Sequence, residues 1–506
     1  MKNLGYIPLA ITFLTIVASC SKFEEFNTDP DKTANANSQL LATHLILQTA
    51  SYPRIGKDFL YKDMLSKYIS YMEGATSYQY NKIERTDFSS LIRLTNVDKM
   101  VSASEGSVYE DSYRALGLFI RAYTFFSLTL SVGDIPYSQA IKAEDGVYNP
   151  LYDTQKEVFI GILNELDEAN RLFALGRDFP GDPVFGGSTL KWQRSVNNLS
   201  LKVLTHLWKK TSDMDMNVVS RFNDIVTRNL LMESNGDNFQ LSYSSLENEH
   251  YPFFNSSFRK YPIMSTTIVD RMKEFKDYRL FYFAEPSEAR MAEGALPTEW
   301  GAYTGVDPSD DFSLISAKYS GKEISGINKR YYELEEGEPT FLLSYAEQCF
   351  IIAEGIVRGW TDGDAKFFYE EGIRSAMLFT AENTPDEPQF SHGIKITPEI
   401  IENYLEGSIV AFEGTLEEQL NKIFQQRYFM GFMQDGWNSF YECRRTGYPE
   451  LPVNELTNLN PIRSQMPRRW MYPAKELSFN RNRVEEAINR QFSGNDDVNE
   501  LMWILK

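Results

Sequence analysis

The clearest periodic pattern of apolar positions runs from Phe341 to Phe379 and predicts two helices joined by a turn. Gly359 suits a left-handed end for the first helix, and Thr361 or Asp362 can cap the second. Two amphipathic helices with a short connection pack as neighbours, as in a tetratricopeptide-type hairpin or an ordinary hairpin of an irregular helical domain. The small and apolar positions that carry the pattern are Leu342, Ala346, Cys349, Ala353 and Ile356, then Ala365, Phe368, Tyr369, Gly372, Ile373 and Ala376.

Similar periodicity predicts a mostly α-helical chain elsewhere. The signal fades over 284–337, where glycine, proline and aromatic residues mix, and this composition is typical of ordered functional loops. Residues 449–479 are rich in proline, asparagine and arginine, and this composition predicts a loop that wraps around the fold. Helices are predicted over 38–50, 57–72, 111–130, 191–210, 265–275, 417–432 and 484–491, and in a segment that Thr154 caps.

The first nineteen residues, 1–19, predict a cleaved signal peptide. Lys2 precedes an apolar run over 7–17, which is shorter than the roughly 20 residues that cross a bilayer. The run ends in the letters VASC, which resemble a bacterial lipobox and make Cys20 the lipidated first residue of the mature chain. Plain secretory cleavage with an incidental cysteine is the alternative. We expect that no later segment is long and apolar enough to cross a membrane.

The charge, cysteine count and aromatic content of the chain limit the functions and folds that it can have. The net charge of −19 gives the chain no electrostatic reason to bind nucleic acid, which repels it. Only Cys349 and Cys443 follow Cys20, so no disulfide framework is expected. Aromatic residues make up 14% of the chain, which suits a large core or carbohydrate-facing surfaces.

No motif indicates catalysis. A glycoside hydrolase needs two carboxylates roughly 5 to 9.5 Å apart across a cleft. Neighbouring pairs such as Glu335-Glu336 and Glu370-Glu371 are expected by chance among 70 acidic residues and are typical of solvated faces. The sequence therefore predicts no catalytic residues, no metal ligands and no cofactor, and it neither requires nor excludes a structural calcium ion.

Five passages together with the lipobox resemble the SusD/RagB family, the surface nutrient-binding lipoproteins of Bacteroidetes. They cover nearly the whole mature chain in the family's order. The short acidic stretch at 21–25 also resembles the tag that sends such lipoproteins to the cell surface. The passages are YRAL through GDIPY at 113–137, FGG with Trp192 and NNL at 185–199, the hairpin at 341–379, Gln426-Arg427 through Trp437 with RRTGYP at 426–449, and PRRWMYP with Asn480 at 467–480.

The resemblance implies a mostly α SusD-like fold with four tetratricopeptide-like hairpins and an irregular, loop-rich face. In one domain over 20–506, the helical hairpins are expected at about 38–230 and 341–380, and the loops at about 240–340 and 385–506. The resemblance also implies a lipid-anchored protein of the cell outer membrane. Its partner would be a SusC-like TonB-dependent barrel, over which the lipoprotein closes after capturing ligand.

We predict that glycan capture without catalysis uses aromatic residues outside the helical stripes, because sugars present C–H faces to aromatic rings. Tyr78 and Tyr80 lie in the first irregular stretch, and Trp300 and Tyr303 in the long one. Both regions correspond to where the resembling family places its ligand loops. The alternatives are rings that pack under their own loops, a surface glycoside hydrolase, a peptide binder for the same type of transporter, and a purely structural partner of the barrel.

The lipobox assignment predicts that Cys20 carries the acyl chains. A Cys20→Ala variant should incorporate no labelled palmitate and should leave the membrane fraction, because the anchor is covalent. The Cys443→Ala variant is the control and should remain labelled. A labelled Cys20→Ala variant would contradict the assignment.

Overall fold

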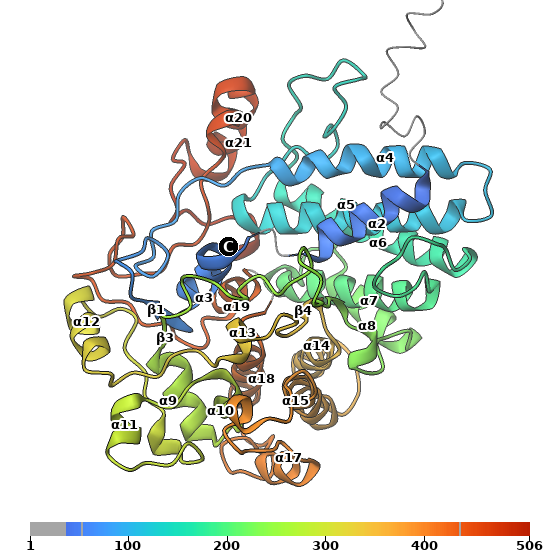
Figure 1. Ribbon diagram of the computed structural model, residues 1–506. Helices are drawn as coiled ribbons and strands as arrows, with labels where there is room; N and C mark the ends of the chain where they lie inside the picture. The colour runs from blue at the N-terminus through green and yellow to red at the C-terminus, as the bar shows by residue number, and fades with distance from the viewer. Residues whose placement is uncertain (1–36, 52–53, 435–436) are drawn as a thin grey trace, which may run out of the picture.

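The structure, a computed structural model, describes residues 37–51, 54–434 and 437–506. The predicted signal peptide and Cys20 lie outside the described residues. The described part is mostly helical, as predicted, and its few strands are three or four residues long. Figure 1 shows long helices across the upper part, a helical hairpin at the lower centre, and short elements at the lower left.

The first half of the chain builds an array of long helices. Consecutive helices pack against each other from α4 through α8, and α2 packs on α4 and α5. The predicted cap at Thr154 is present as a capping box, in which Thr154 and Glu157 satisfy each other's backbone N–H groups. The helices are α2 (Ser38–Ala50), α4 (Arg93–Ser104), α5 (Glu110–Val132), α6 (Gln155–Leu175), α7 (Thr189–His206) and α8 (Val218–Arg228), with 3₁₀ turns at η2 (Ser89–Ile92), η3 (Trp208–Lys210) and η4 (Asn235–Asp237).

Helix α5 corrects one expectation. By length and composition it could cross a membrane, with a mean hydropathy of 1.5 over its most apolar window. Of that window, 78% is buried inside the fold, because α4, α6 and α7 pack around the helix. Its apolar character therefore serves the core.

The predicted hairpin is present as α14 (Tyr345–Val357) and α15 (Ala365–Glu382). Gly359 has a φ of +72°, which is the left-handed end that the sequence predicted. A Cβ atom at Gly372 would lie 2.6 Å from the ring of Phe350, so this glycine lets α15 approach α14 closely. Helix α14 also packs on α7, which joins the hairpin to the first array.

Two details of that hairpin differ from prediction. The first helix begins only at residue 345, after β4 (Thr340–Leu343), because this segment pairs with β2 (Phe239–Leu241) instead of continuing the helix. The cap of the second helix is Asp364, which accepts from the N–H of Phe367, and neither Thr361 nor Asp362 takes that role. The side chain of Thr361 instead donates to Asn223 at 2.9 Å.

The helix predicted over 57–72 is wrong in its second half. The chain forms η1 (Gly56–Leu60) and α3 (Tyr61–Leu65), and then β1 (Ile69–Tyr71) pairs antiparallel with β3 (Pro262–Met264). A left-handed residue, Lys67 with a φ of +63°, separates helix from strand. Long-range pairing overrides the local helical pattern here.

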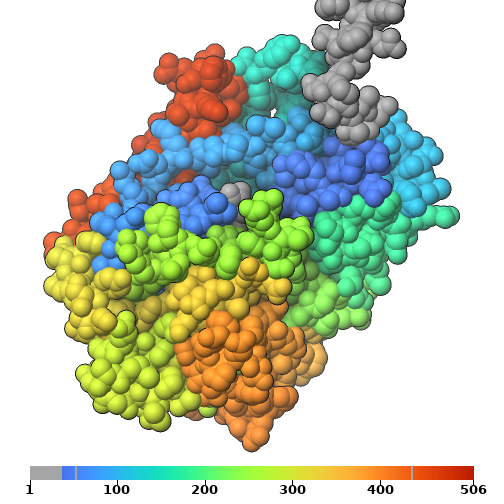
Figure 2. Space-filling model, viewed as in Figure 1, coloured from blue at the N-terminus to red at the C-terminus, as the bar shows by residue number. Residues whose placement is uncertain are grey.

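The loop-rich part contains many short helices between its turns. Figure 2 shows α20 and α21, in red, projecting above α4, and the orange α15 and α17 at the lower edge. The elements are α9 (Thr266–Phe275), α10 (Leu280–Phe283), α11 (Glu288–Ala292), η5 (Trp300–Ala302), α12 (Phe312–Ser320), α13 (Arg330–Glu333), α16 (Pro388–Ser391), α17 (Pro398–Leu405), α18 (Leu416–Met430), α19 (Asn438–Thr446), α20 (Ala474–Phe479), α21 (Arg481–Phe492) and η6 (Trp503–Leu505).

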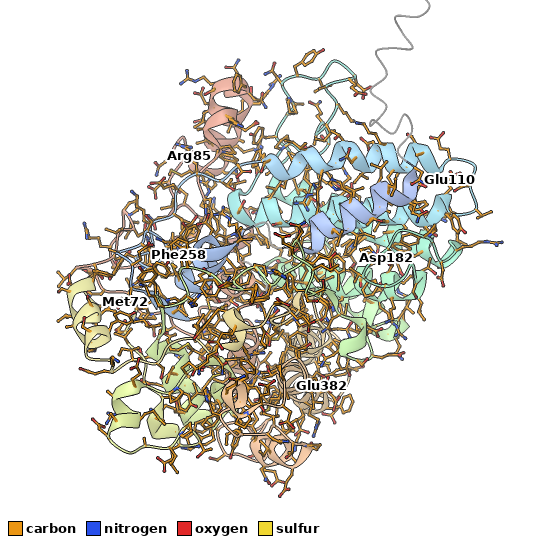
Figure 3. All side chains as sticks on the ribbon, viewed as in Figure 1. Met72, Arg85, Glu110, Asp182, Phe258 and Glu382 are labelled. Carbon is orange, nitrogen blue, oxygen red and sulfur yellow. The ribbon has the colours of Figure 1, made fainter. Side chains whose placement is uncertain are left out.

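The C-terminal segment wraps back onto an early part of the chain. Arg85, labelled in Figure 3, donates to the carbonyl of Tyr472 and to Asp496, both at 2.7 Å. The N–H of Leu459 donates to the carbonyl of Tyr80 at 2.8 Å. The chain end and the segment after β1 therefore form one surface.

A group of buried charges joins four helices near the centre of the fold. Its members come from α7, α14, α18 and α19, and all six side chains are buried. We call this group the ionic cluster, and it consists of Lys202, Glu347, Glu354, Arg427, Glu442 and Arg445.

The two arginines of the ionic cluster bridge its three carboxylates. Arg445 lies 2.7 Å from both Glu354 and Glu442. Arg427 lies 2.7 Å from Glu442 and 3.1 Å from Glu347. Burial alone would raise the pKa of Glu442, but the guanidinium groups of Arg427 and Arg445 hold it below its ordinary range. Burial would likewise raise the pKa of Glu354, but Arg445 holds it below its ordinary range, so Glu354 and Glu442 are ionised and charge-assisted hydrogen bonds fix their helices.

Removing Arg445 should destabilise the fold strongly. An Arg445→Met variant leaves Glu354 and Glu442 buried with fewer partners, and we expect the free energy of unfolding to fall by about 3 kcal/mol or more. Urea denaturation followed by circular dichroism measures the change.

The matched control is Arg481→Met. Arg481 pairs with Glu485 on the surface of α21, with 72% of its side chain exposed, so its loss should leave stability almost unchanged. Equal effects of the two variants would show that the ionic cluster has no special role.

Candidate ligand-binding site

A pocket of about 310 Å³ is lined by residues from the end of α2, the start of α4, the middle of α5 and the start of α19. Aromatic rings, cationic groups and small polar groups share its wall. We call it the Trp437 pocket, and it is lined by Gln48, Thr49, Ser51, Arg54, Asp87, Ser89, Arg93, Tyr123, Phe126, Ser127, Leu130, Lys202, Leu342, Trp437, Asn438 and Tyr441.

A row of aromatic rings extends from the wall of the Trp437 pocket. The ring centroids of Trp437 and Tyr78 lie 5.6 Å apart, and Tyr78 stacks on Tyr61 at 4.5 Å with an interplanar angle of 25°. All three rings are partly exposed. Because sugar rings pack their C–H faces on flat aromatic surfaces, the row has the chemistry of a carbohydrate platform.

The ionic cluster lies directly beneath this pocket. Asn438 lines the pocket, and its Nδ2 donates to Glu347 Oε1 at 3.0 Å. Lys202 also lines the pocket, and its Nζ lies 3.2 Å from Glu347 Oε2. Trp437 is backed by the buried ring of Trp470, with centroids 5.0 Å apart. The position of Trp437 is therefore set by rigid contacts on its inner side.

Of the tyrosines predicted in the first irregular stretch, Tyr78 belongs to the aromatic row and Tyr80 does not. Tyr80 is 5% exposed, and its hydroxyl donates to the carbonyl of Asp310 at 3.0 Å. Its ring packs under the loop and offers no open face to a ligand. Burial raises the pKa of the Tyr80 hydroxyl to about 12, so it stays protonated.

The predicted pair in the long irregular segment lies elsewhere in the fold. Tyr303 is fully buried, and its hydroxyl donates to the carbonyl of Pro297 at 2.8 Å, so its ring has no face open to a ligand. Trp300 is partly exposed and packs on Phe281 at 4.7 Å and Tyr278 at 5.3 Å. Neither residue lines the Trp437 pocket. The structure thus does not bring the four predicted aromatic residues into one site.

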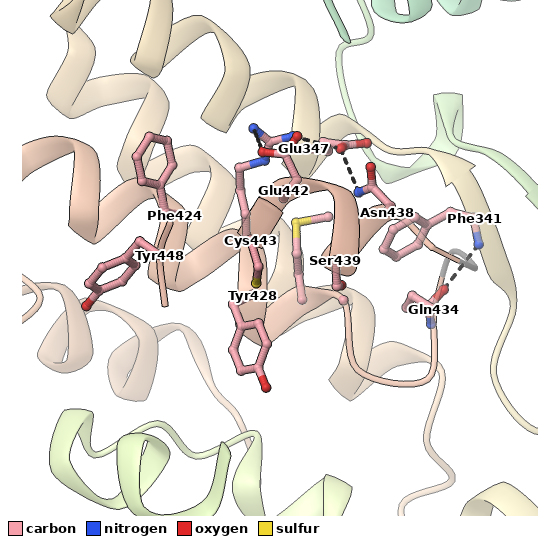
Figure 4. Close-up of a pocket in the computed structure, with 13 residues that line it drawn as sticks. Phe341, Glu347, Phe424, Tyr428, Gln434, Asn438, Ser439, Glu442, Cys443 and Tyr448 are labelled. Carbon is pink, nitrogen blue, oxygen red and sulfur yellow. Dashed lines mark hydrogen bonds and ion pairs between the residues drawn. The ribbon is translucent and has the colours of Figure 1, made fainter. Parts of the chain in front are cut away.

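The cavity in Figure 4 lies on the other side of the ionic cluster. Glu347, Asn438 and Glu442 border it, together with Phe424 and Tyr448. Its volume is about 20 Å³, which is room for one water molecule and not for a sugar. Burial would raise the pKa of Glu442, but Arg427 and Arg445 hold it below its ordinary range, so Glu442 does not have the raised pKa of a general acid.

A broad, shallow recess of about 710 Å³ lies beside the hairpin, near Glu382, which Figure 3 labels. It is lined by Glu333, Glu335, Glu336 and Glu382, with Tyr243 and Phe254 at its apolar side. Within the part of the chain that the structure describes, no group of three or more His, Cys, Asp or Glu side chains is placed to hold a metal ion.

Sequence reasoning missed Trp437 and the two arginines of the pocket, Arg54 and Arg93. Trp437 follows a helix-ending stretch, and a large aromatic residue at such a polar break is the signal that could have found it. Arg54 and Arg93 give no such signal, because only the folded chain places them beside α19.

Comparisons with known proteins point to one group. A SusD-like family model, described as "Starch-binding associating with outer membrane", matches residues 30–473. No curated protein sequence matches the chain. The structure of a SusD homologue from Bacteroides fragilis is similar, with 43% identity, a TM-score of 0.90, and coverage of 93% of this chain and 100% of that one.

Two further solved structures extend the comparison. A second SusD homologue from Bacteroides fragilis is 36% identical, with a TM-score of 0.83 and coverage of 93% of this chain and 100% of that one. A chitin-binding SusD homologue from Flavobacterium johnsoniae is 22% identical, with a TM-score of 0.71 and coverage of 92% and 98%. The last of these shows the same fold.

Proposed function

This chain belongs to the SusD-like family, whose description is starch-binding associating with the outer membrane, and from that membership we propose that it is a surface lipoprotein that binds glycans. It delivers them to a SusC-like TonB-dependent outer-membrane transporter. Cys20 supplies the lipid anchor, and the protein faces outward from the cell outer membrane.

The observation that carries the proposal is the aromatic row of Trp437, Tyr78 and Tyr61, in which Trp437 also lines a pocket of about 310 Å³. Stacked, partly exposed rings beside hydrogen-bonding groups are the combination that carbohydrate sites use. A chitin-binding relative with the same fold supports a glycan as the ligand class. Trp300 remains a proposed second contact, because its ring is also partly exposed.

Binding without catalysis fits the composition of the Trp437 pocket. Its lining contains one carboxylate, Asp87, which accepts hydrogen bonds from the N–H and hydroxyl of Ser89. A glycoside hydrolase requires two opposed carboxylates. Two further carboxylates, Glu354 and Glu442, lie in the ionic cluster, where Arg427 and Arg445 hold them ionised despite their burial.

Trp437→Ala should weaken glycan binding about tenfold or more, since it removes the stacking surface of the pocket. The binding glycan is first identified on an array of neutral, acidic and peptide-linked ligands, and its affinity is then measured by calorimetry. Tyr78→Ala should act in the same direction.

Trp300→Ala is the matched comparison. It removes a second partly exposed tryptophan that lies outside the pocket. If only Trp300→Ala weakens binding, the ligand site is in the long irregular segment and not at Trp437. Exclusive binding of oligopeptides on the array would favour the peptide-binding alternative.

Purified protein should release no new reducing ends from any glycan that it binds. Incubation for a day followed by a reducing-sugar assay tests this, with a known glycosidase as the positive control. Turnover that persists in the Trp437→Ala variant but stops on heat denaturation would show a catalytic site elsewhere in the molecule.

A further inference from the structure

Among the residues that the structure describes, two arginines of the Trp437 pocket have no carboxylate partner. Arg93 donates from Nη1 to the carbonyl of Gln48 at 3.2 Å and from Nε to the carbonyl of Ser90 at 3.1 Å. Its remaining contact is with the hydroxyl of Thr49 at 3.5 Å. All of these partners are neutral, so the charge of Arg93 is solvated by dipoles alone.

Arg54 is the second cation. Among the described residues it makes no ion pair, and its guanidinium lies 5.8 Å from the centroid of Tyr61, at the end of the aromatic row. Arg54 thus lies beside the proposed sugar platform as well as in the pocket wall. A guanidinium in this position keeps several N–H donors available for a ligand.

The charge balance of the pocket is opposite to that of the chain. The lining has three cationic side chains, Arg54, Arg93 and Lys202, against the single carboxylate of Asp87. Lys202 is already paired with Glu347 in the ionic cluster, and Asp87 is exposed and bonded to Ser89. The whole chain, in contrast, carries 70 acidic and 51 basic residues. Two arginines left without carboxylates in such a chain indicate a place for an external anion.

We infer that the Trp437 pocket takes an acidic saccharide, in which a carboxylate or sulfate group meets Arg54 and Arg93 while the sugar ring packs on Trp437. Guanidinium groups bind carboxylate and sulfate oxygens by paired, charge-assisted hydrogen bonds. Partly buried cations are stabilised when such an anion arrives, because their cost of desolvation is then offset. The net charge of −19 on the whole chain repels anions in general, so selectivity would come from these two residues. The inference rests on the proposed glycan-binding function and narrows its ligand class.

The test compares matched ligands that differ only in charge. Calorimetry with oligogalacturonate and with its fully methyl-esterified form separates a carboxylate from a neutral sugar of the same length and linkage. A comparison of chondroitin sulfate tetrasaccharides with their desulfated forms, which keep their carboxylates, tests whether sulfate is the recognised group. We expect one charged form to bind about tenfold or more tightly than its matched neutral or desulfated form.

Single-residue variants show which side chains cause the preference for charged ligands. Arg54→Gln and Arg93→Gln should each remove most of that preference, whereas Arg481→Gln, which removes a positive charge from the surface of α21, should not. If Arg93→Gln fails to fold because α2 loses its contacts, the ligand preference of Arg54→Gln alone tests the inference. The preference should also shrink as salt rises from 50 to 500 mM.

The outcomes separate this inference from the proposed function. Neutral glycans that bind as tightly as the charged forms, in a manner that depends on Trp437, would overturn the inference and leave glycan capture intact. A charge preference that Arg54→Gln and Arg93→Gln do not change would place the anion outside this pocket and would also overturn it. Absence of binding to any glycan of the array would overturn both.

Discussion

The ionic cluster is the constraint on which the rest of the molecule depends. Bringing charged groups out of water costs free energy that is recovered only in good geometry, so buried clusters tolerate few alternative arrangements. Here Arg427 and Arg445 hold carboxylates from α14 and α19 at hydrogen-bonding distances. The helical hairpin, the first helical array and the C-terminal helices therefore meet in one fixed arrangement.

Single side chains connect the ionic cluster to the candidate ligand site. Asn438 and Lys202 each contact Glu347 with one side and the Trp437 pocket with the other. The aromatic row combines two positions that are close in sequence, Tyr61 and Tyr78, with one distant position, Trp437. A rigid helical base thus presents side chains from irregular segments, which is a common division of labour between scaffold and binding loops.

Sequence patterns predicted those parts of the fold that are decided locally. The bounds of α2 and the capping box before α6 follow from spacing and from caps within a few residues. The strand β1 could not be found this way, because its partner β3 is almost two hundred residues away. The same limit explains why the sequence could not predict which aromatic residues line the candidate site. A tyrosine in a polar stretch looks the same in sequence whether it is buried with its hydroxyl on a carbonyl, as in Tyr80, or lies partly exposed between two other rings, as in Tyr78. The family resemblance was more informative, since it identified the mostly helical SusD-like architecture before any contact was known.

The return of the C-terminal segment to the early part of the chain has a consequence for biogenesis. Residues near the end of the chain complete the surface beside Tyr80 and Arg85, and the tryptophan of the pocket, Trp437, directly precedes α19. A nascent polypeptide lacks these parts and cannot form the candidate pocket. The pocket is therefore complete only after the last part of the chain has been synthesised.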